Sequence, residues 1–200
     1  MDERAQTFTL EAFVAAIILV GALAFALQAV AISANTASGG DLEWRTQQAT
    51  VTEDVLAQAA ADGSLVDTVV AWNESDARFH GASHEDGHYV TSLPADAPAG
   101  PAFAAIVGES TTRYSVDLRY PDGTGGWAVQ PLVDAGTPST NAVRVTETVT
   151  IFENTSMIDA DGEPRATNVS AIDEPFYAPN VDDERAVYTV IRVEVTVWRH

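Results

Sequence analysis

The sequence contains no cysteine and no lysine. The absence of cysteine excludes disulfides, zinc–thiolate sites, iron–sulfur clusters and catalytic thiols. The ten basic residues are all arginine and stand against 29 aspartates and glutamates, which gives a formal net charge of −19. Because phosphate backbones repel a chain this acidic, we expect no nucleic-acid partner.

The acidic residues occur in every stretch of fifty residues, and the longest run is Asp182-Asp183-Glu184. An acidic interaction tail would instead form a block. The spread indicates a surface adapted to molar salt, where the Debye length falls to about 3 Å and hydrated carboxylates resist aggregation. Missing lysine together with abundant Ala, Val and Thr resembles haloarchaeal proteins.

One long uncharged run lies near the N-terminus, from Ala12 to Ile32. A helix of about 20 such residues spans a bilayer, so the run predicts a transmembrane helix. A cleavable signal peptide, cut between residues 33 and 40, is the alternative. It normally has an apolar region of about 7 to 15 residues behind a basic start, whereas this chain begins Met1-Asp2-Glu3-Arg4.

Four regions follow from the composition and the hydrophobic period. We expect a leader and helix start at 1–11, a transmembrane helix at 12–32, an extracellular helical stalk at 33–72 and a β-rich head at 73–200. The head's strands are expected at 113–120, 127–133, 143–152 and 186–198, where apolar and polar residues alternate. The predicted fold class is α+β: a long N-terminal membrane-spanning helix followed by an antiparallel β-sheet head.

The charge also suggests which side of the membrane the head faces. Residues 41–200 hold 26 acidic residues and nine arginines, a net charge of −17. They include three Asn-x-Ser/Thr triplets, at Asn73, Asn154 and Asn168, which are glycosylation acceptors in an outside domain. Unmodified polar loops are the alternative. We expect a single-pass protein of the cell membrane with an extracellular C-terminal head, alone or in a surface filament.

The N-terminal residues carry a family resemblance. Arg4-Ala5-Gln6 resembles the archaeal prepilin processing site, and Phe8-Thr9-Leu10-Glu11 resembles the start of bacterial pilin helices. The order of leader, apolar helix, amphipathic helix and β-rich head is similar to that of type IV pilin-like proteins. The resemblance covers residues 4–32 and implies cleavage by a prepilin peptidase between Ala5 and Gln6.

Glu11 is the only charged residue between Arg4 and Asp41. A carboxylate at the edge of an apolar run is costly to bury alone; the resemblance implies that it pairs with the N-terminal amine of a neighbouring subunit. Cleavage before Gln6 makes Glu11 the sixth mature residue, whereas the family places it fifth. A carboxylate at the helix's positive N-terminal pole is the alternative role. Small residues such as Gly21 allow close helix packing.

Three histidines, His80, His84 and His88, lie four residues apart. On a helix this spacing would put them on one face, where imidazoles suit zinc or another divalent ion. Residues 84–88 also match the letters of the H-E-x-x-H motif, but Asp86-Gly87 and the surrounding composition indicate a polar loop. No glycine-rich phosphate loop precedes a helix, and no Gly-x-Ser-x-Gly elbow is present. We therefore expect neither an enzyme nor a cofactor.

Two functions remain from the sequence. The first is a structural subunit of an archaeal type IV pilus-like filament or envelope assembly, which packs through its N-terminal helix. Its partners would be the membrane, copies of itself or related pilin-like subunits, and a prepilin peptidase. The second is a membrane-anchored extracellular binding protein whose histidine loop holds a metal or a ligand.

Overall fold

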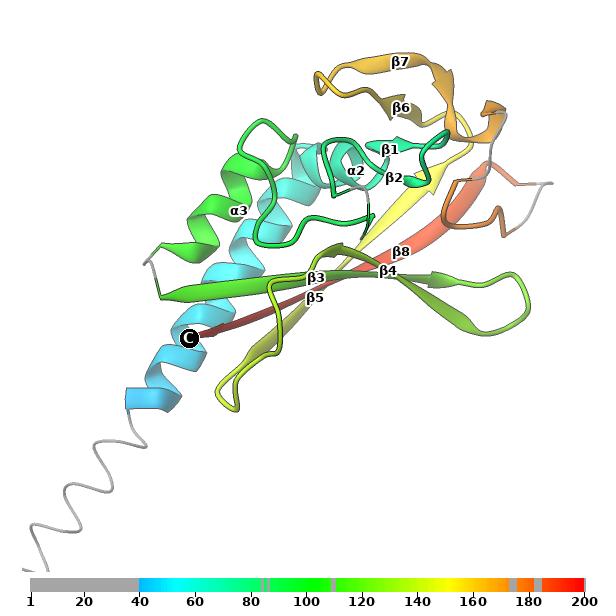
Figure 1. Ribbon diagram of the computed structural model, residues 1–200. Helices are drawn as coiled ribbons and strands as arrows, with labels where there is room; N and C mark the ends of the chain where they lie inside the picture. Colours follow the sequence, from blue (N-terminus) through cyan, green and yellow to red (C-terminus); the bar gives the residue numbers. More distant parts are fainter. Residues whose placement is uncertain are drawn as a thin grey trace, which may run out of the picture. The chain divides into compact units, whose positions relative to one another are not determined.

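The computed structural model describes residues 40–83, 85, 87–108, 111–172, 176–181 and 185–199 (Figure 1). The chain divides into two compact units, residues 1–44 and 45–200. In the first unit the described residues, 40–44, are helical. The predicted leader and the predicted transmembrane helix at 12–32 lie outside the described residues. The strands and the remaining helices belong to the second unit.

A four-stranded antiparallel sheet forms the centre of this unit. Its strands are β3 (Thr112–Pro121), β4 (Trp127–Val133), β5 (Val143–Phe152) and β8 (Val187–Arg199), in the order β4-β3-β8-β5. The long last strand lies between β3 and β5, and Val195 pairs with Val116 on one side and Val145 on the other. Alternating β-branched residues favour these strands, because every second side chain points to the same face.

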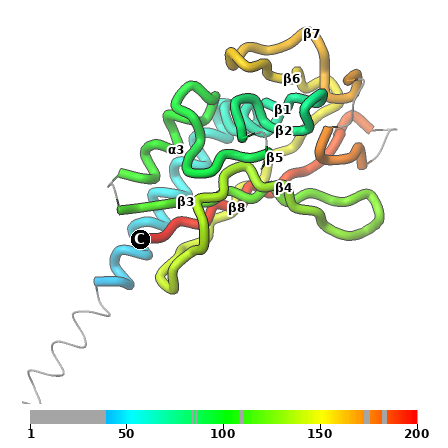
Figure 2. The backbone as a smooth tube through the Cα atoms, in the orientation of Figure 1, coloured from blue at the N-terminus to red at the C-terminus, as the bar shows by residue number. Residues whose placement is uncertain are grey.

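Helices cover one face of the sheet, which we call the inner face (Figures 1 and 2). The helix of residues 45–61 contributes Leu56, α2 (Ser64–Val69) contributes Leu65, and α3 (Gly100–Val107) contributes Phe103. These three side chains have 0% exposure. Each such burial stabilises the fold by about 1.5–3 kcal/mol. The inner-face strand residues in the same core include Tyr114, Val116, Leu118, Val145, Val149, Ile151, Ile191, Val193 and Val195.

Two small hairpins pack beside the main sheet. The first joins β1 (Trp72–Asn73) to β2 (Arg78–Phe79), and the second joins β6 (Ser156–Ile158) to β7 (Pro164–Asn168), which a 3-10 turn (Val169–Ala171) follows. A two-residue pairing is too short to be stable alone. Edge-to-face aromatic contacts hold the first hairpin in the core, with Trp72 and Phe79 ring centroids 5.1 Å apart.

The predicted fold class, α+β with a long N-terminal membrane-spanning helix, is wrong. The described structure is mostly β, with antiparallel sheets and short helices, and its one long helix, at 40–61, is too polar to span a membrane because its sides carry Asp41, Glu43, Glu53 and Asp54. Among the described residues, no helix combines the length and apolarity needed to cross a bilayer. This finding also overturns the predicted single-pass membrane localisation with an extracellular head.

Candidate functional site

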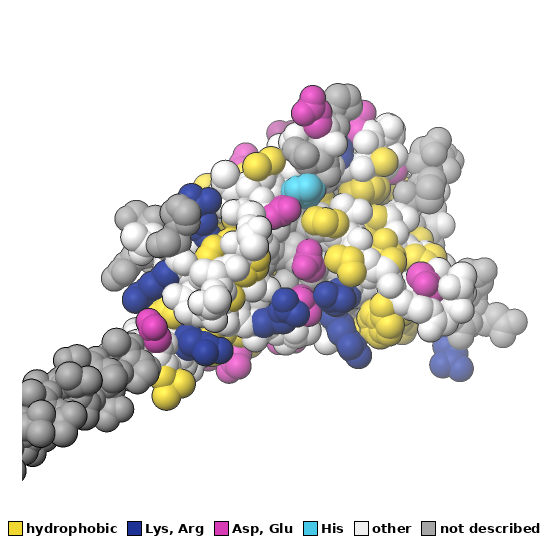
Figure 3. Space-filling view, turned by 60° about the horizontal axis from the view of Figure 1, so that its bottom comes forward, with side chains coloured by type: hydrophobic (Ala, Val, Ile, Leu, Met, Phe, Trp, Pro, Cys, Tyr) yellow, Lys and Arg dark blue, Asp and Glu magenta, His cyan; other side chains and the backbone are white. Residues whose placement is uncertain are grey.

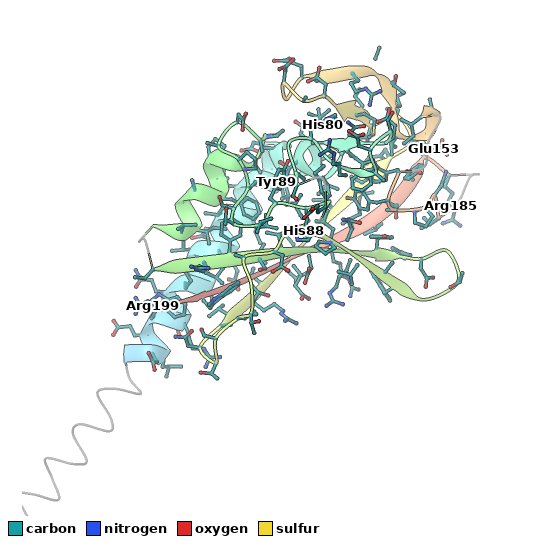
Figure 4. All side chains as sticks on the ribbon, viewed as in Figure 1. His80, His88, Tyr89, Glu153, Arg185 and Arg199 are labelled. Carbon is teal, nitrogen blue, oxygen red and sulfur yellow. The ribbon has the colours of Figure 1, made fainter. Side chains whose placement is uncertain are left out.

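A hollow of about 320 Å³ opens beside His80, between the segment that follows β2 and the turn between β6 and β7. Its polar lining comes from His80, Tyr89, Asp96 and Asp159. Figure 4 shows His80 and Tyr89 on neighbouring segments above the sheet. The volume is at the lower end of the range of small-molecule sites, about 300–1,000 Å³.

Backbone hydrogen bonds fix the two segments. The amide of His80 donates to the carbonyl of Ala71 at 3.1 Å, which continues the pairing of β1 with β2. The amide of Tyr89 donates to Leu132 O at 3.0 Å, and its carbonyl accepts from Asp134 N at 2.8 Å. Tyr89 is therefore fastened to the end of β4, and its hydroxyl donates to His80 O at 2.5 Å.

Burial sets the protonation of both side chains. It lowers the pKa of His80 from its ordinary 6.5. Arg165 acts in the same direction, and the carboxylates of Glu74 and Asp159 and a hydrogen bond to the backbone of Ile158 oppose it. Burial also raises the pKa of Tyr89 to about 12, with the charge of Asp96 adding to the effect. At neutral pH the imidazole is therefore neutral and the phenol remains a donor.

The atom of chemical interest is His80 Nε2, which is buried and makes no hydrogen bond to any described group. An unpaired buried polar atom costs free energy, and a small polar ligand would satisfy it. The neighbouring carboxylate of Asp159 is occupied in part, since its Oδ1 accepts from the amides of Asp161 and Glu163 at 2.9 Å. The arrangement fits hydrogen-bonding recognition of a small molecule.

The predicted metal ligands are not gathered on a helix. Residues 80–81 form a turn, 82–83 are irregular and 87–88 are bends, so a spacing of four does not place histidines on one helical face. His80 and His88 lie apart in Figure 4, and His84 lies outside the described residues. Within the described part of the chain, no group of three or more His, Cys, Asp or Glu side chains is placed to hold a metal ion.

The other predicted site residues are scattered. Asn73 lies at the end of β1, where its side chain bonds Asp76 through both amide atoms, at 3.0 and 3.2 Å. Asn154 is exposed in the turn after β5, and Asn168 ends β7. Glycosylation there remains a prediction. Ala5, Gln6, Glu11 and Gly21 lie outside the described residues.

Sequence reasoning missed Tyr89, Asp96 and Asp159 as companions of His80. They come from irregular segments that only the folded chain brings together, so no spacing rule would have found them. It also missed the ion pair of Glu74 with Arg165, which acts on His80 and has two hydrogen bonds of 2.8 Å.

Comparison with known proteins identifies a family. No curated protein and no solved structure matches the sequence significantly. A protein-family model described as "Family of unknown function (DUF7288)" matches residues 4–197. Since this match spans nearly the whole chain, the protein belongs to the DUF7288 family.

Proposed function

We propose that this chain is a structural subunit of a type IV pilus-like filament, in which it packs against copies of itself or related pilin-like chains. The observation that carries the proposal is that helices cover only one face of the four-stranded sheet (Figure 1). The opposite face, which we call the outer face, carries no helix in the described part of the chain. Its strands offer a rigid platform on which another subunit can pack.

Large apolar side chains stand exposed on this outer face. Trp127 and Val129 on β4 are 51% and 43% exposed, and Phe152 at the end of β5 is 46% exposed. The space-filling view shows hydrophobic side chains beside arginines on the side that includes this face (Figure 3). Exposed apolar area next to charged residues is typical of protein–protein contact surfaces.

The N-terminal sequence supports the same proposal. In this interpretation a prepilin peptidase removes residues 1–5, Gln6 becomes the first mature residue, and Glu11 pairs with the amine of a neighbour. The match to the DUF7288 family begins at residue 4, so the family includes this segment.

Processing and assembly of the full chain in its native host test the proposal. N-terminal sequencing is expected to find Gln6 as the first residue, and electron microscopy with sedimentation to find elongated assemblies. Glu11→Gln should reduce assembly, whereas the matched control Glu43→Gln, on an exposed helical position, should not. An intact Met1 on a chain that stays monomeric at all concentrations would overturn the proposal.

The hollow beside His80 favours a second candidate function, binding of a small polar molecule. Its test is a ligand screen that follows the ring nuclei of His80 by NMR. A compound that binds there should shift the His80 signals and leave those of His88, which lies apart from it, unchanged. Hits that shift neither histidine would contradict this candidate.

A further inference from the structure

The outer face of the sheet carries a cluster of charged side chains around Glu194. This residue lies in the middle of β8, directly opposite Asp117 on β3 and Thr146 on β5. Its side chain is only 12% exposed, and its two oxygens lie 3.3 Å from Arg119 Nε and 3.2 Å from Arg144 Nη1. One carboxylate from the central strand therefore holds arginines from both neighbouring strands.

A third arginine extends the cluster toward the β3–β4 hairpin. Arg192 lies opposite Arg119 in the strand register, and its guanidinium carbon lies 4.4 Å from the ring centroid of Trp127. A cation over an indole face is attracted by the ring quadrupole, and the stacking holds the guanidinium flat over exposed sheet. The result is a planar cation next to an exposed aromatic side chain.

The outer face carries more arginines than carboxylates, which is the reverse of the rest of the chain. The outward positions of the four strands carry four of the ten arginines, including Arg113, but only two carboxylates, Asp117 and Glu194. The outward strand positions therefore have a formal charge of +2, and the charge of Asp134, on the connection tied to this face, acts on Asp117. Six arginines and 27 acidic residues remain elsewhere, so the rest of the chain has a formal charge of −21.

The internal ion pairs do not satisfy these groups. Arg119 Nε and Glu194 Oε1 are buried, yet neither makes a hydrogen bond to a described group, because the ion pairs are close in distance but poorly aligned. Each guanidinium carries five N–H donors in a fork that fits a carboxylate. Burial and the charge of Glu194 also raise the pKa of Asp117, which weakens that residue as a partner. The arginines therefore retain capacity for further carboxylates.

We propose that the outer face, from Arg113 to Arg192 across β3, β8 and β5, binds a carboxylate-rich surface of a second copy of this chain. This inference rests on the proposed function, since it names the surface by which the heads meet. Charge complementarity favours a second copy as the partner, because the outward strand positions carry +2 while the rest of the chain carries −21. Direct guanidinium–carboxylate contacts of about 3 Å are also no longer than the Debye length at 1 M salt.

The charge pattern also fixes the symmetry of the contact. A two-fold contact between two outer faces would place arginines against arginines, and like charges in an interface cost several kcal/mol. The outer face must therefore meet a different surface of the next copy. Such head-to-tail contacts do not close on themselves unless the rotation forms a ring, so they build filaments. Nucleic acids and acidic polysaccharides are the competing occupants, but the total charge of −19 repels them.

Charge reversal on the outer face tests the inference. Self-association of the full chain is measured by sedimentation velocity over a concentration series, at one salt concentration at which circular dichroism shows every variant folded. The double variant Arg144→Glu/Arg192→Glu should weaken association at least tenfold, and Arg144→Gln/Arg192→Gln should do so less. The matched control Arg45→Glu, which reverses an exposed arginine on the helix of residues 40–61, should leave association unchanged.

A cysteine probe reads the symmetry, because the natural chain has no cysteine. Thr148 is exposed and lies opposite Arg192 on this face, so the Thr148→Cys variant is expected to give no disulfide between two copies within the assemblies. Efficient disulfide formation there would overturn the head-to-tail geometry.

The outcomes separate the two proposals. If the natural chain assembles and the charge reversals change nothing, or Arg45→Glu weakens association equally, the outer-face inference is wrong and the proposed function stands. If the natural chain never self-associates, both are wrong. Binding of heparin or single-stranded DNA to the outer face without self-association would likewise overturn the inference.

Discussion

Replacing Glu74 with glutamine removes a charge from a contact that joins distant parts of the chain. Glu74 follows β1, and Arg165 lies 91 positions later on β7. Arg165 Nη1 and Nη2 each donate to one carboxylate oxygen at 2.8 Å, the two-bond geometry that is strongest for this pair. Glutamine keeps the shape but loses the charge and one acceptor, so the substitution isolates the ionic part of the contact.

The burial of the pair sets the size of the effect. The side chains of Glu74 and Arg165 are 15% and 30% exposed. An exposed ion pair contributes about 0.2–1 kcal/mol, whereas breaking a buried pair costs about 3–5 kcal/mol. Partial exposure places Glu74→Gln between these limits, at about 1–2 kcal/mol. For a chain of this size that corresponds to a decrease in Tm of about 3–6 °C.

The pH dependence provides a second test of the same change. The hydrogen bonds from Arg165 hold the pKa of Glu74 below its ordinary 4.5. The pair therefore contributes its full stability above about pH 4.5, and that contribution is lost as the pH falls through the folded-state pKa. The difference between natural chain and Glu74→Gln should shrink in acid.

Denaturant unfolding from pH 3 to pH 7 measures both effects, and a double-mutant cycle with Arg165→Met isolates the coupling. Asp76→Asn is the matched control, because Asp76 meets Arg78 through a single 3.0 Å contact with side chains 38% and 25% exposed. It should cost less than about 1 kcal/mol. A coupling energy near zero for Glu74 and Arg165 at pH 7, or one that does not shrink as the pH is lowered, would refute the reasoning.

Three further predictions concern the hydrophobic core, the close contact between Gly100 and Pro94, and His80 beside the hollow. Leu56→Ala should lower the free energy of unfolding by about 3 kcal/mol in denaturant titrations, because the side chain is fully buried between helix and sheet; a loss below about 1 kcal/mol would contradict this packing. Gly100→Ala should lower Tm by several degrees, because an added Cβ would lie 2.1 Å from Pro94 O; an unchanged Tm would disprove that close approach. NMR titration should place the pKa of His80 in the folded chain below its ordinary 6.5. Between the folded-state pKa and 6.5 the unfolded chain binds more protons, so the free energy of unfolding rises with pH. A pKa above 6.5 would exclude a buried neutral imidazole.

The sequence predicted the strands well because alternation is a local signal. Expected strands at 127–133 and 143–152 coincide with β4 and β5, and the other two differ from β3 and β8 by a residue at each end. Within residues 33–72, where the sequence predicted a helical stalk, the structure has helices at 40–61 and Ser64–Val69. The strand order was not predictable, because hydrogen-bond partners far apart in the sequence leave no periodic signal.

Alternation also failed where the chain crosses the sheet. By alternation, Trp198 belongs with Arg192 and Glu194 on the outer face of the last strand, yet it is only 2% exposed. The connection from β4 to β5 must pass from one edge of the sheet to the other. It is tied to the outer face by Ala135 N donating to Ser115 Oγ and by Ser139 Oγ donating to Arg199 O, both at 3.1 Å. A covering loop hides an outward side chain, which a single strand's pattern does not reveal.

For the candidate sites too, the sequence predicted single residues but not the partners that the fold brings to them. His80 was identified from the histidine spacing, but its partners were not, and the structure surrounds it with a hollow rather than a helical face. The charged cluster around Glu194 went unnoticed because Arg119, Arg144 and Glu194 are separated by 25 and 50 positions. Only the register of β3, β8 and β5 brings them together.

Sedimentation velocity of the processed full-length chain tests the central claim, self-assembly, most directly. The account predicts that the chain forms larger, elongated species as its concentration rises and that electron microscopy resolves them as filaments. Arg144→Glu/Arg192→Glu should markedly reduce this assembly, whereas Arg45→Glu should not. A single monomeric boundary for the natural chain over the whole concentration range would contradict the account.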